Sequence, residues 1–307
     1  MESPAVLLLA HGTPDKPEDV PSYLKNVTSG RPLPEEVVKE VERRYQLIGR
    51  SPLTELTFQQ SEAIALQLGI PAYVGMRNWK PYIRDTVLEM AEEGITHAVV
   101  LCMAPHNSRT SVGLYKRAVV GETGRAPFTV DFVENWHDHP LLIEAFAERL
   151  RDGWKRACAE ARCELPVIFT AHSVPQRTIE AGDPYEAQAR ETATLVAQQV
   201  PEVFRGTWKF AFQSQGMSGG AWIGPTVEET ILALKSQGHS GVFVQPVGFL
   251  CDHVEVLYDI DIAFREFAVS QGMNLWRAES LNDSPLLARA VAALVRERLA
   301  AKLAGAR

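Results

Sequence analysis

The apolar and polar positions of this chain fall into alternating blocks, which predict strands separated by helices. Short runs of apolar or β-branched residues predict buried strands, and apolar residues repeated every three or four positions predict helices. The predicted strands are Ala5–Ala10, Ala72–Met76, Ala98–Met103, Val167–Thr170, Trp208–Gln213 and Val242–Pro246. The predicted helices are Pro34–Ile48, Thr57–Leu68, Tyr82–Glu93, Leu141–Arg162, Tyr185–Gln199, Thr226–Ser236 and Pro285–Ala304. Strands that alternate with helices of this size predict parallel sheets with right-handed crossovers.

Two motifs occur twice, in the same order, and this indicates an internal repeat. LLLAHGTP (Leu7–Pro14) is echoed by IFTAHSVP (Ile168–Pro175), in which an apolar strand again leads into Ala-His, a small residue and a nearby proline. PYIRDTVLEMAEEG (Pro81–Gly94) is echoed by PTVEETILALKSQG (Pro225–Gly238). Both copies predict a helix with proline at its first position and glycine just after its last. The chain is therefore expected to contain two related halves.

The expected fold class is α/β, with two similar Rossmann-like domains whose parallel sheets face a central cleft. The N-terminal domain is expected at residues 1–140 and the C-terminal domain at 163–280, joined by a helix, with helix 285–305 packing back on the first domain. Ligands of open parallel sheets bind beyond the carboxyl ends of the strands. Because His11 and His172 both stand at the carboxyl end of the first strand of their half, two imidazoles are expected in one cleft.

Composition narrows the class of protein. The chain has 307 residues, of which 46% are hydrophobic and 22% charged, and this predicts a globular protein with a large core. Its net charge of -7 argues against general nucleic-acid binding, which needs a basic surface. The N-terminal apolar run lacks a basic flank and is too short for a signal peptide or a membrane span, so we expect a cytoplasmic protein without an integral membrane segment. The 4 cysteines show no CxxC spacing, so neither a disulfide framework nor an iron–sulfur cluster is expected.

Nucleotide-binding fingerprints are missing from the chain. No G-x-G-x-x-G follows the first strand, and no G-x-x-x-x-G-K-[ST] occurs. The glycine-rich stretch Gln215–Gly224 precedes a helix without the spacing of a phosphate cradle, and it predicts a flexible loop.

The stretch Pro246–Asp261 holds the second set of candidate chemical groups. Its helical spacing predicts a helix with Asp252 as the N-cap and with Glu255 and Asp259 on one face. Glu255 would lie in the first turn, beside the expected cleft, whereas His253 is expected to point elsewhere on the helix and to be structural or to support the residues of the site. A histidine with a carboxylate suits a divalent ion such as ferrous iron, and equally suits proton abstraction. A solvated acidic face is the alternative for Asp259 and Asp261.

Six motifs together resemble those of one enzyme family. AHGTP, RRYQLIGRSPL, APHNSRTSVGLYKRA, FTAHSVP, WIGP and PVGFLCDHVEVLYDID occur here in the order found in ferrochelatases, most like the coproporphyrin-type enzymes of Gram-positive bacteria. The resemblance covers nearly the whole chain. It implies a lyase of haem biosynthesis that inserts ferrous iron into a porphyrin, with loss of two pyrrole protons. It also implies two Rossmann-like domains that hold the macrocycle in the cleft between them.

The resemblance assigns the catalytic and metal-binding pair. The histidine of the AHS motif is His172 and the glutamate of the DHxEVL motif is Glu255, and in the family this pair binds incoming iron and accepts the pyrrole protons. The family position that matches His11 is commonly tyrosine, which approaches the metal from the opposite face of the porphyrin. An imidazole at this place is expected to ligate the iron of the product axially, and a purely structural role is the alternative.

Substrate contacts also follow from the resemblance. Positions that bind propionate groups in the family are matched by Arg44, Tyr45, Ser51 and Tyr115. Arginine with hydroxyl groups is the chemistry expected for carboxylates, although Arg44 and Tyr45 could simply end a helix and Ser51 could cap the next. Two positions depart from the family. Thr28 stands where it has an arginine, with Arg31 nearby, and Ala263 interrupts a line of carboxylates, so an outer metal site is weakened or absent.

The basic segment Pro21–Leu53 suggests which porphyrin is used. It is expected to cover the pocket, and it has no long apolar lip and contains Lys25, Arg31, Arg43, Arg44 and Arg50. Coproporphyrin III, with four carboxylates, suits such a cover better than protoporphyrin IX. The expected reaction is therefore the conversion of coproporphyrin III to Fe-coproporphyrin III (coproheme). No cofactor is expected beyond substrate Fe²⁺, and a downstream haem-synthesis enzyme is a candidate partner.

Three alternatives stay open. One is a protoporphyrin IX ferrochelatase that gives protohaem. Another is a cobalt or iron chelatase acting on a sirohydrochlorin-type tetrapyrrole, since such enzymes share the two-lobed design and a histidine-based metal site. The third, of a different class, is a non-catalytic protein that binds haem or metal.

Overall fold

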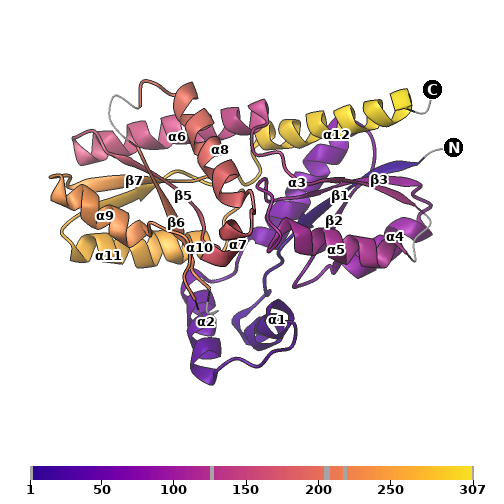
Figure 1. Cartoon of the computed structure of the whole chain (residues 1–307), viewed down its shortest axis with the longest axis horizontal. Coiled ribbons are helices and arrows are strands. Elements are labelled where there is room, and N and C mark those ends of the chain that lie inside the picture. Colours follow the sequence, from indigo (N-terminus) through magenta and orange to yellow (C-terminus); the bar gives the residue numbers. More distant parts are fainter. Residues whose placement is uncertain (1–2, 125–127, 204–207, 217–219, 306–307) are drawn as a thin grey trace. The chain divides into compact units, whose positions relative to one another are not determined.

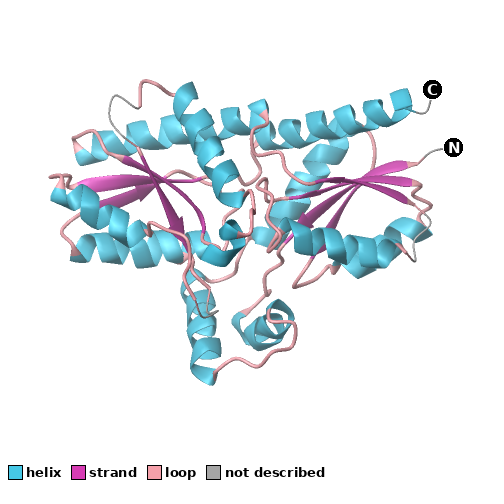
Figure 2. Ribbon diagram, viewed as in Figure 1, coloured by secondary structure: helices cyan, strands magenta, loops and turns pink. Residues whose placement is uncertain are grey.

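A computed structural model describes residues 3–124, 128–203, 208–216 and 220–305 of the protein (Figures 1 and 2). The chain divides into two compact units. The first unit comprises residues 1–105, 111–135 and 282–307, and the second comprises residues 106–110 and 136–281. The boundaries of domains that fold independently stay a prediction. In the described part of the chain, no helix combines the length and the apolar character needed to span a membrane.

Each unit contains one sheet of four parallel strands, and the two sheets have the same order of strands. The first sheet has the order β2-β1-β3-β4 and is built from β1 (Pro4–Ala10), β2 (Ala72–Met76), β3 (His97–Cys102) and β4 (Thr129–Val133). The second has the order β6-β5-β7-β8 and is built from β5 (Val167–His172), β6 (Lys209–Gln213), β7 (Gly241–Pro246) and β8 (Asn274–Arg277). The predicted α/β class with parallel sheets is confirmed.

Helices cover both faces of each sheet (Figure 1). The helices of the first unit are η1 (Pro17–Asp19), α1 (Val20–Val27), α2 (Glu35–Ile48), α3 (Leu53–Leu68), α4 (Ile83–Glu92), α5 (Val112–Thr123) and α12 (Pro285–Gly305). Of these, η1, α1 and α2 pack on one another beside the sheet (Figure 1). The helices of the second unit are α6 (Pro140–Ala161), α7 (Gln176–Glu180), α8 (Tyr185–Gln199), α9 (Val227–Ser236), α10 (Val254–Leu257), the π-helix η2 (Asp259–Phe264) and α11 (Arg265–Ser270). Helix α12 packs on α3, where Arg296 donates a hydrogen bond to the carbonyl of Gln67.

The structure supports the internal repeat through matching contacts in each unit. At the end of β2 the backbone NH of Met76 donates to the carbonyl of Pro81, and at the end of β6 that of Phe212 donates to Pro225. Each proline lies one residue before the N-cap of the following helix, so the prediction that it occupies the first helical position was wrong. The predicted terminal glycine is correct, because Gly94 has φ +76° and Gly238 has φ +89°, which favour glycine.

Two other local expectations need comment. Helix α3 begins at Leu53 rather than Thr57, with Pro52 as its N-cap, so Ser51 does not cap it. Residues 217–219 of the predicted glycine-rich loop 215–224 lie outside the described residues.

Candidate functional site

The strongest candidate site lies in the second unit and consists of His172 and Glu255. Strand β5 is buried as far as Ala171, and His172 is its last residue, at the carboxyl end. Glu255 is the second residue of α10, the short helix that follows β7. The Nδ1 atom of His172 lies 3.1 Å from Oε2 of Glu255, and the two side chains are 36% and 33% exposed. An imidazole and a carboxylate are thus in contact and reachable from solvent.

Two further polar groups adjoin this pair. The hydroxyl of Ser214 donates to Asp259, which is buried at the start of η2. The Nε2 atom of His253 lies 3.8 Å from Oε2 of Glu255, and its Nδ1 donates to the carbonyl of Cys251. The expectation that His253 points away from Glu255 was wrong, because His253 precedes the helix in an extended conformation. Asp259 is not part of a solvated acidic face.

The backbone that carries His172 is fixed on several sides. The hydroxyl of Tyr185 donates to the carbonyl of His172 over 2.9 Å, and the next residue, Ser173, donates its NH to the carbonyl of Gln213. Gly248 lies against Ala171 so closely that a Cβ atom on it would stand 2.7 Å from that side chain. The absence of a side chain at Gly248 therefore lets the loop after β7 bring Glu255 beside the end of β5.

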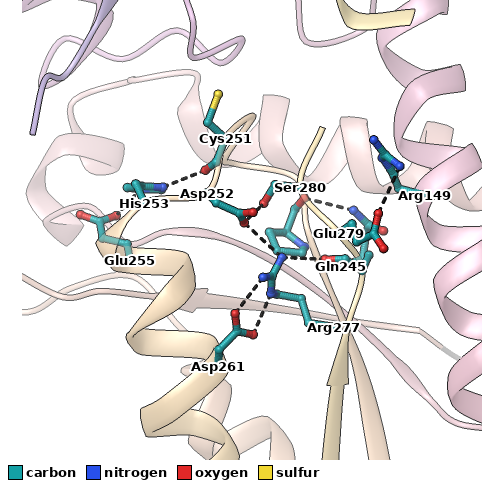
Figure 3. Close-up of polar contacts among 12 residues, drawn as sticks. Arg149, Gln245, Cys251, Asp252, His253, Glu255, Asp261, Arg277, Glu279 and Ser280 are labelled. Carbon is teal, nitrogen blue, oxygen red and sulfur yellow. Dashed lines mark hydrogen bonds and ion pairs between the residues drawn. The ribbon is translucent and has the colours of Figure 1, made fainter. Parts of the chain in front are cut away.

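The N-terminus of the helix that carries Glu255 differs from the sequence prediction. The N-cap is His253, without a side-chain cap, whereas Asp252 accepts a hydrogen bond from the hydroxyl of Ser280 (2.7 Å) and pairs with Arg277 (3.3 Å) (Figure 3). Asp252 was the predicted cap because aspartate before an apolar run is the usual signal. Here a distant arginine competes for the same carboxylate.

Electrostatics favour an imidazolium next to a carboxylate. Desolvation, the largest influence, lowers the pKa of His172, but the charge and hydrogen bond of Glu255 and the charge of Asp259 together raise it above its usual value. Desolvation also raises the pKa of Glu255, yet His172 and then His253 hold it well below the usual range. The Glu255 carboxylate therefore stays ionised, and it is available to a cation or a proton.

His11 belongs to a separate group in the first unit. It is exposed directly after β1, and its Nε2 atom lies 2.9 Å from the hydroxyl of Tyr23. The ring of Tyr23 in turn packs edge-on against those of Tyr45 and Trp79. Gly12 has φ +79°, and a Cβ atom on it would lie 2.8 Å from the backbone nitrogen of Trp79. A glycine is therefore required where the chain turns after His11.

The predicted propionate-binding residues all lie in the first unit, and most of them are buried. Tyr45 is 1%, Ser51 3% and Tyr115 6% exposed, and the guanidinium of Arg77 lies 5.9 Å from the centre of the Tyr115 ring. Among the described residues the Ser51 hydroxyl has no hydrogen-bond partner. Arg44 is half-buried, and its Nε donates to Glu40 over 3.0 Å.

A cavity in the first unit is lined by residues of the predicted basic cover. It has a volume of about 300 Å³ and lies between α1 and α2, where Lys25 and Arg31 line it together with apolar residues. The hydroxyl of Thr28 donates to the carbonyl of Arg31, so the arginine that replaces the expected family residue is anchored at its backbone. The cavity thus combines an apolar lining with two cations.

Several residues near the candidate pair were not predicted from the sequence. Tyr185 and Gln213 fix the backbone around it, since the side-chain amide of Gln213 donates to the carbonyl of Glu255. Arg277 at the end of β8 and Ser280 just after it bind Asp261 and Asp252, on either side of Glu255 in the chain. No local spacing connects these residues to Glu255, so the sequence carries no signal that could have found them.

Comparison with known proteins adds independent findings. The ferrochelatase family profile matches residues 3–299. The chain is 55% identical to a ferrochelatase of Acidobacterium capsulatum, over 97% of this chain and 95% of that protein. It is 33% identical to the coproporphyrin III ferrochelatase of Bacillus subtilis, over 96% of this chain and 97% of that protein.

A solved structure resembles the fold. SirB from Bacillus subtilis with Fe³⁺ matches with a TM-score of 0.62 and 12% identity, over 96% of this chain and 95% of that chain. At this identity the likeness shows a shared chelatase-type fold and nothing about the substrate.

Proposed function

This chain belongs to the ferrochelatase family, and from that premise we propose that it inserts ferrous iron into coproporphyrin III to give Fe-coproporphyrin III. Membership makes the chain a lyase of the metal-chelatase type, with a porphyrin and ferrous iron as its substrates, in haem and porphyrin biosynthesis. The proposed porphyrin goes further than membership, and the observation that supports it is the basic surface around α1 and α2.

We propose that His172 and Glu255 perform the insertion. Iron enters the macrocycle as a dication while two pyrrole N–H bonds break, so the site must hold a cation and take up protons. The ionised Glu255 carboxylate and the imidazole of His172, in contact over 3.1 Å, offer one oxygen and one nitrogen ligand to ferrous iron. Iron that binds the imidazole displaces its proton to solvent. When iron moves on, the imidazole can accept one pyrrole proton and the Glu255 carboxylate can accept the other. The two protons finally pass to solvent.

The substrate proposal rests on charge. Residues 21–53 are all described, and their exposed cations include Lys25, Arg31, Arg43 and Arg50. Among these residues the large hydrophobic side chain that is exposed is that of Leu47, at 52%. Acidic side chains take up part of this charge, because Glu40 pairs with Arg43 and Arg44, which lower its pKa to about 2. Lys25 and Arg31 line the cavity, and a porphyrin with four carboxylates can use such cations better than one with two.

We propose that Arg44, Tyr45, Ser51 and Tyr115 contribute to propionate binding. What supports this proposal is the buried Ser51 hydroxyl, which has no hydrogen-bond partner among the described residues. A propionate carboxylate would satisfy this hydroxyl.

Steady-state assays with three tetrapyrroles test the proposed substrate. With ferrous iron under anaerobic conditions, we expect kcat/KM for coproporphyrin III to exceed that for protoporphyrin IX by about 10-fold or more, since each charge-assisted hydrogen bond contributes about 1.5–3 kcal/mol. Lys25→Ala and Arg31→Ala should narrow this ratio, whereas Lys235→Ala on exposed α9 surface should not. Equal or better turnover of protoporphyrin IX would overturn the substrate proposal. Turnover of sirohydrochlorin alone, or binding of porphyrin without metallation, would favour the alternatives.

We propose that His11 ligates the iron of the product axially. Its exposed imidazole at the end of β1 supports this proposal, although ligation through Nε2 requires the Tyr23 hydroxyl to give way. His11→Ala is expected to change the axial-ligand bands in the absorption spectrum of the protein with bound Fe-coproporphyrin III. Tyr23→Phe keeps the imidazole and serves as the control. An unchanged His11→Ala spectrum would leave His11 the structural role of holding Tyr23.

Three further expectations stay predictions: a cytoplasmic location, a reaction that needs no cofactor beyond its substrate iron, and transfer of the product to a downstream haem-synthesis enzyme.

A further inference from the structure

Arg277, the last residue of β8, joins the two chain segments that flank Glu255 (Figure 3). Its Nε and Nη2 atoms donate to the two carboxylate oxygens of Asp261, each over 2.8 Å. Its Nη1 atom lies 3.3 Å from Oδ1 of Asp252 and donates to the carbonyl of Ala278 over 2.9 Å. One guanidinium therefore holds one carboxylate on each side of Glu255.

The helical segment that carries Glu255 is too short to be stable by itself. Helix α10 has four residues, which is about one turn, and its N-cap residue His253 provides no side-chain cap. A single helical turn is not stable by itself. The π-helix η2 follows it, and π-turns are rarer than α-turns and frequently occur at functional sites. The place of the Glu255 carboxylate must therefore be set by contacts from elsewhere in the unit.

The contacts of Arg277 are suited to that task. The side chains of Arg277, Asp252 and Asp261 are 12%, 20% and 23% exposed, so the cluster is largely shielded from water. A bidentate guanidinium–carboxylate pair in such surroundings fixes both distance and orientation. The hydroxyl of Ser280 adds a 2.7 Å hydrogen bond to Asp252. Loss of the guanidinium would remove the charge of Arg277 from the shielded Asp252 carboxylate and leave Asp261 with its longer 3.8 Å contact to Arg265.

We propose that Arg277 is a positioning residue for the metal-insertion reaction: by clamping Asp252 and Asp261 it sets the place of Glu255 beside His172. The inference rests on the proposed catalytic role of Glu255. Arg277 acts through the backbone of α10 and η2, since its two carboxylate partners lie three residues before and six residues after Glu255 in the chain. A shift of about 1 Å in a reacting group can lower a rate about 100-fold.

Steady-state kinetics of iron insertion test this role in the full-length protein. Arg277→Ala is expected to lower kcat by about 10- to 100-fold while KM for the porphyrin changes less than about 2-fold, because the misplacement affects the reacting groups. Arg277→Lys should recover part of kcat, since an ammonium supplies the charge but cannot hold both oxygens of Asp261. The matched control is Arg149→Ala, because Arg149 contacts Glu279 in the same region over 3.3 Å and should leave kcat unchanged (Figure 3).

A double variant separates positioning from general stabilisation. In a Glu255→Gln background, Arg277→Ala should lower kcat no further, because the group that it positions is already altered. The inference would be overturned if Arg277→Ala lowered kcat equally in the wild-type and Glu255→Gln backgrounds. It would also be overturned if Arg277→Ala kept wild-type kcat while Glu255→Gln lowered it. Wild-type kcat in Glu255→Gln would overturn the role of Glu255 and the inference together.

A milder variant keeps the test valid if Arg277→Ala does not fold, as judged by circular dichroism. Ser280→Ala removes only the hydroxyl that bonds Asp252. It should lower kcat by about 2- to 10-fold at unchanged porphyrin KM, in keeping with about 1 kcal/mol for one hydrogen bond. Unchanged kcat in both Ser280→Ala and Arg277→Lys would overturn the inference.

Discussion

Replacing Glu255 with glutamine is expected to lower the rate of iron insertion by about 100- to 1,000-fold, the usual size of an acid–base contribution. The amide keeps the shape of the carboxylate but can neither accept a pyrrole proton nor neutralise ferrous iron. His172→Ala should have an effect of similar size, because the two side chains are in contact over 3.1 Å. The measurement is kcat with coproporphyrin III and ferrous iron, beside porphyrin binding followed by fluorescence.

The effects of Glu255→Gln and His172→Ala on kcat should not be additive. If the pair acts as one unit, the double variant should be about as slow as either single variant. Glu266→Gln on exposed α11 and His239→Ala in the exposed turn before β7 are matched controls, and both should retain wild-type kcat. Multiplication of the two single effects in the double variant would show instead that each residue acts alone.

The stability of the protein is expected to depend on pH through His106. This residue is 2% exposed, and its Nε2 atom lies 2.9 Å from the hydroxyl of Thr192. Thr192 gives its own proton to a backbone carbonyl, that of His137 over 2.9 Å, so the imidazole is the donor. Burial, and then the charge of nearby His137, lower the pKa of His106 from 6.5 to about 3. The folded protein therefore keeps this imidazole neutral where the unfolded chain would protonate it.

The sign of the dependence follows from these values. The unfolded chain takes up a proton at His106 below about pH 6.5, whereas the folded protein does so only near pH 3. The contribution of neutral His106 to the free energy of unfolding is therefore complete above pH 6.5 and is lost as the pH falls toward 3. Between pH 7 and 5 the free energy of unfolding should fall by about 2 kcal/mol through this group alone.

Urea unfolding at pH 7 and pH 5 measures this contribution. His106→Gln retains an amide donor for Thr192 but does not titrate, so its loss of unfolding free energy on acidification should be about 2 kcal/mol smaller than that of the wild type. Titrating groups that do not interact with His106 are present in both proteins and cancel in the difference. Equal losses in the two proteins would contradict the expected pKa of His106.

The central strands and the edge strands β2 and β6 could be predicted from the sequence, but the edge strands β4 and β8 could not. β1, β3, β5 and β7 are buried on both faces and therefore appear as continuous apolar runs. The edge strands β4 and β8 have five and four residues and are only partly buried, so they leave a weak periodic signal. Helix α5 was missed because it contains Gly113 and Gly121, which lower helix propensity.

The candidate pair could be predicted from the sequence, whereas the contacts around it could not. His172 ends a buried strand and Glu255 follows the next strand of the same sheet, so parallel topology alone brings them to one edge. The role of Arg277 depends on tertiary contacts with Asp252 and Asp261, for which the sequence carries no periodic pattern. The incorrect cap at Asp252 has the same origin, since a remote arginine outweighed a local preference.

Anaerobic stopped-flow absorption under single-turnover conditions tests the proposed role of the pair most directly. Wild-type protein and Glu255→Gln are each loaded with coproporphyrin III and then mixed with ferrous iron. The wild type is expected to convert the free-base spectrum to that of the iron product, while Glu255→Gln retains the free-base spectrum over times at least about 100-fold longer. Conversion by both proteins at the same rate would contradict the assignment of iron insertion to His172 and Glu255.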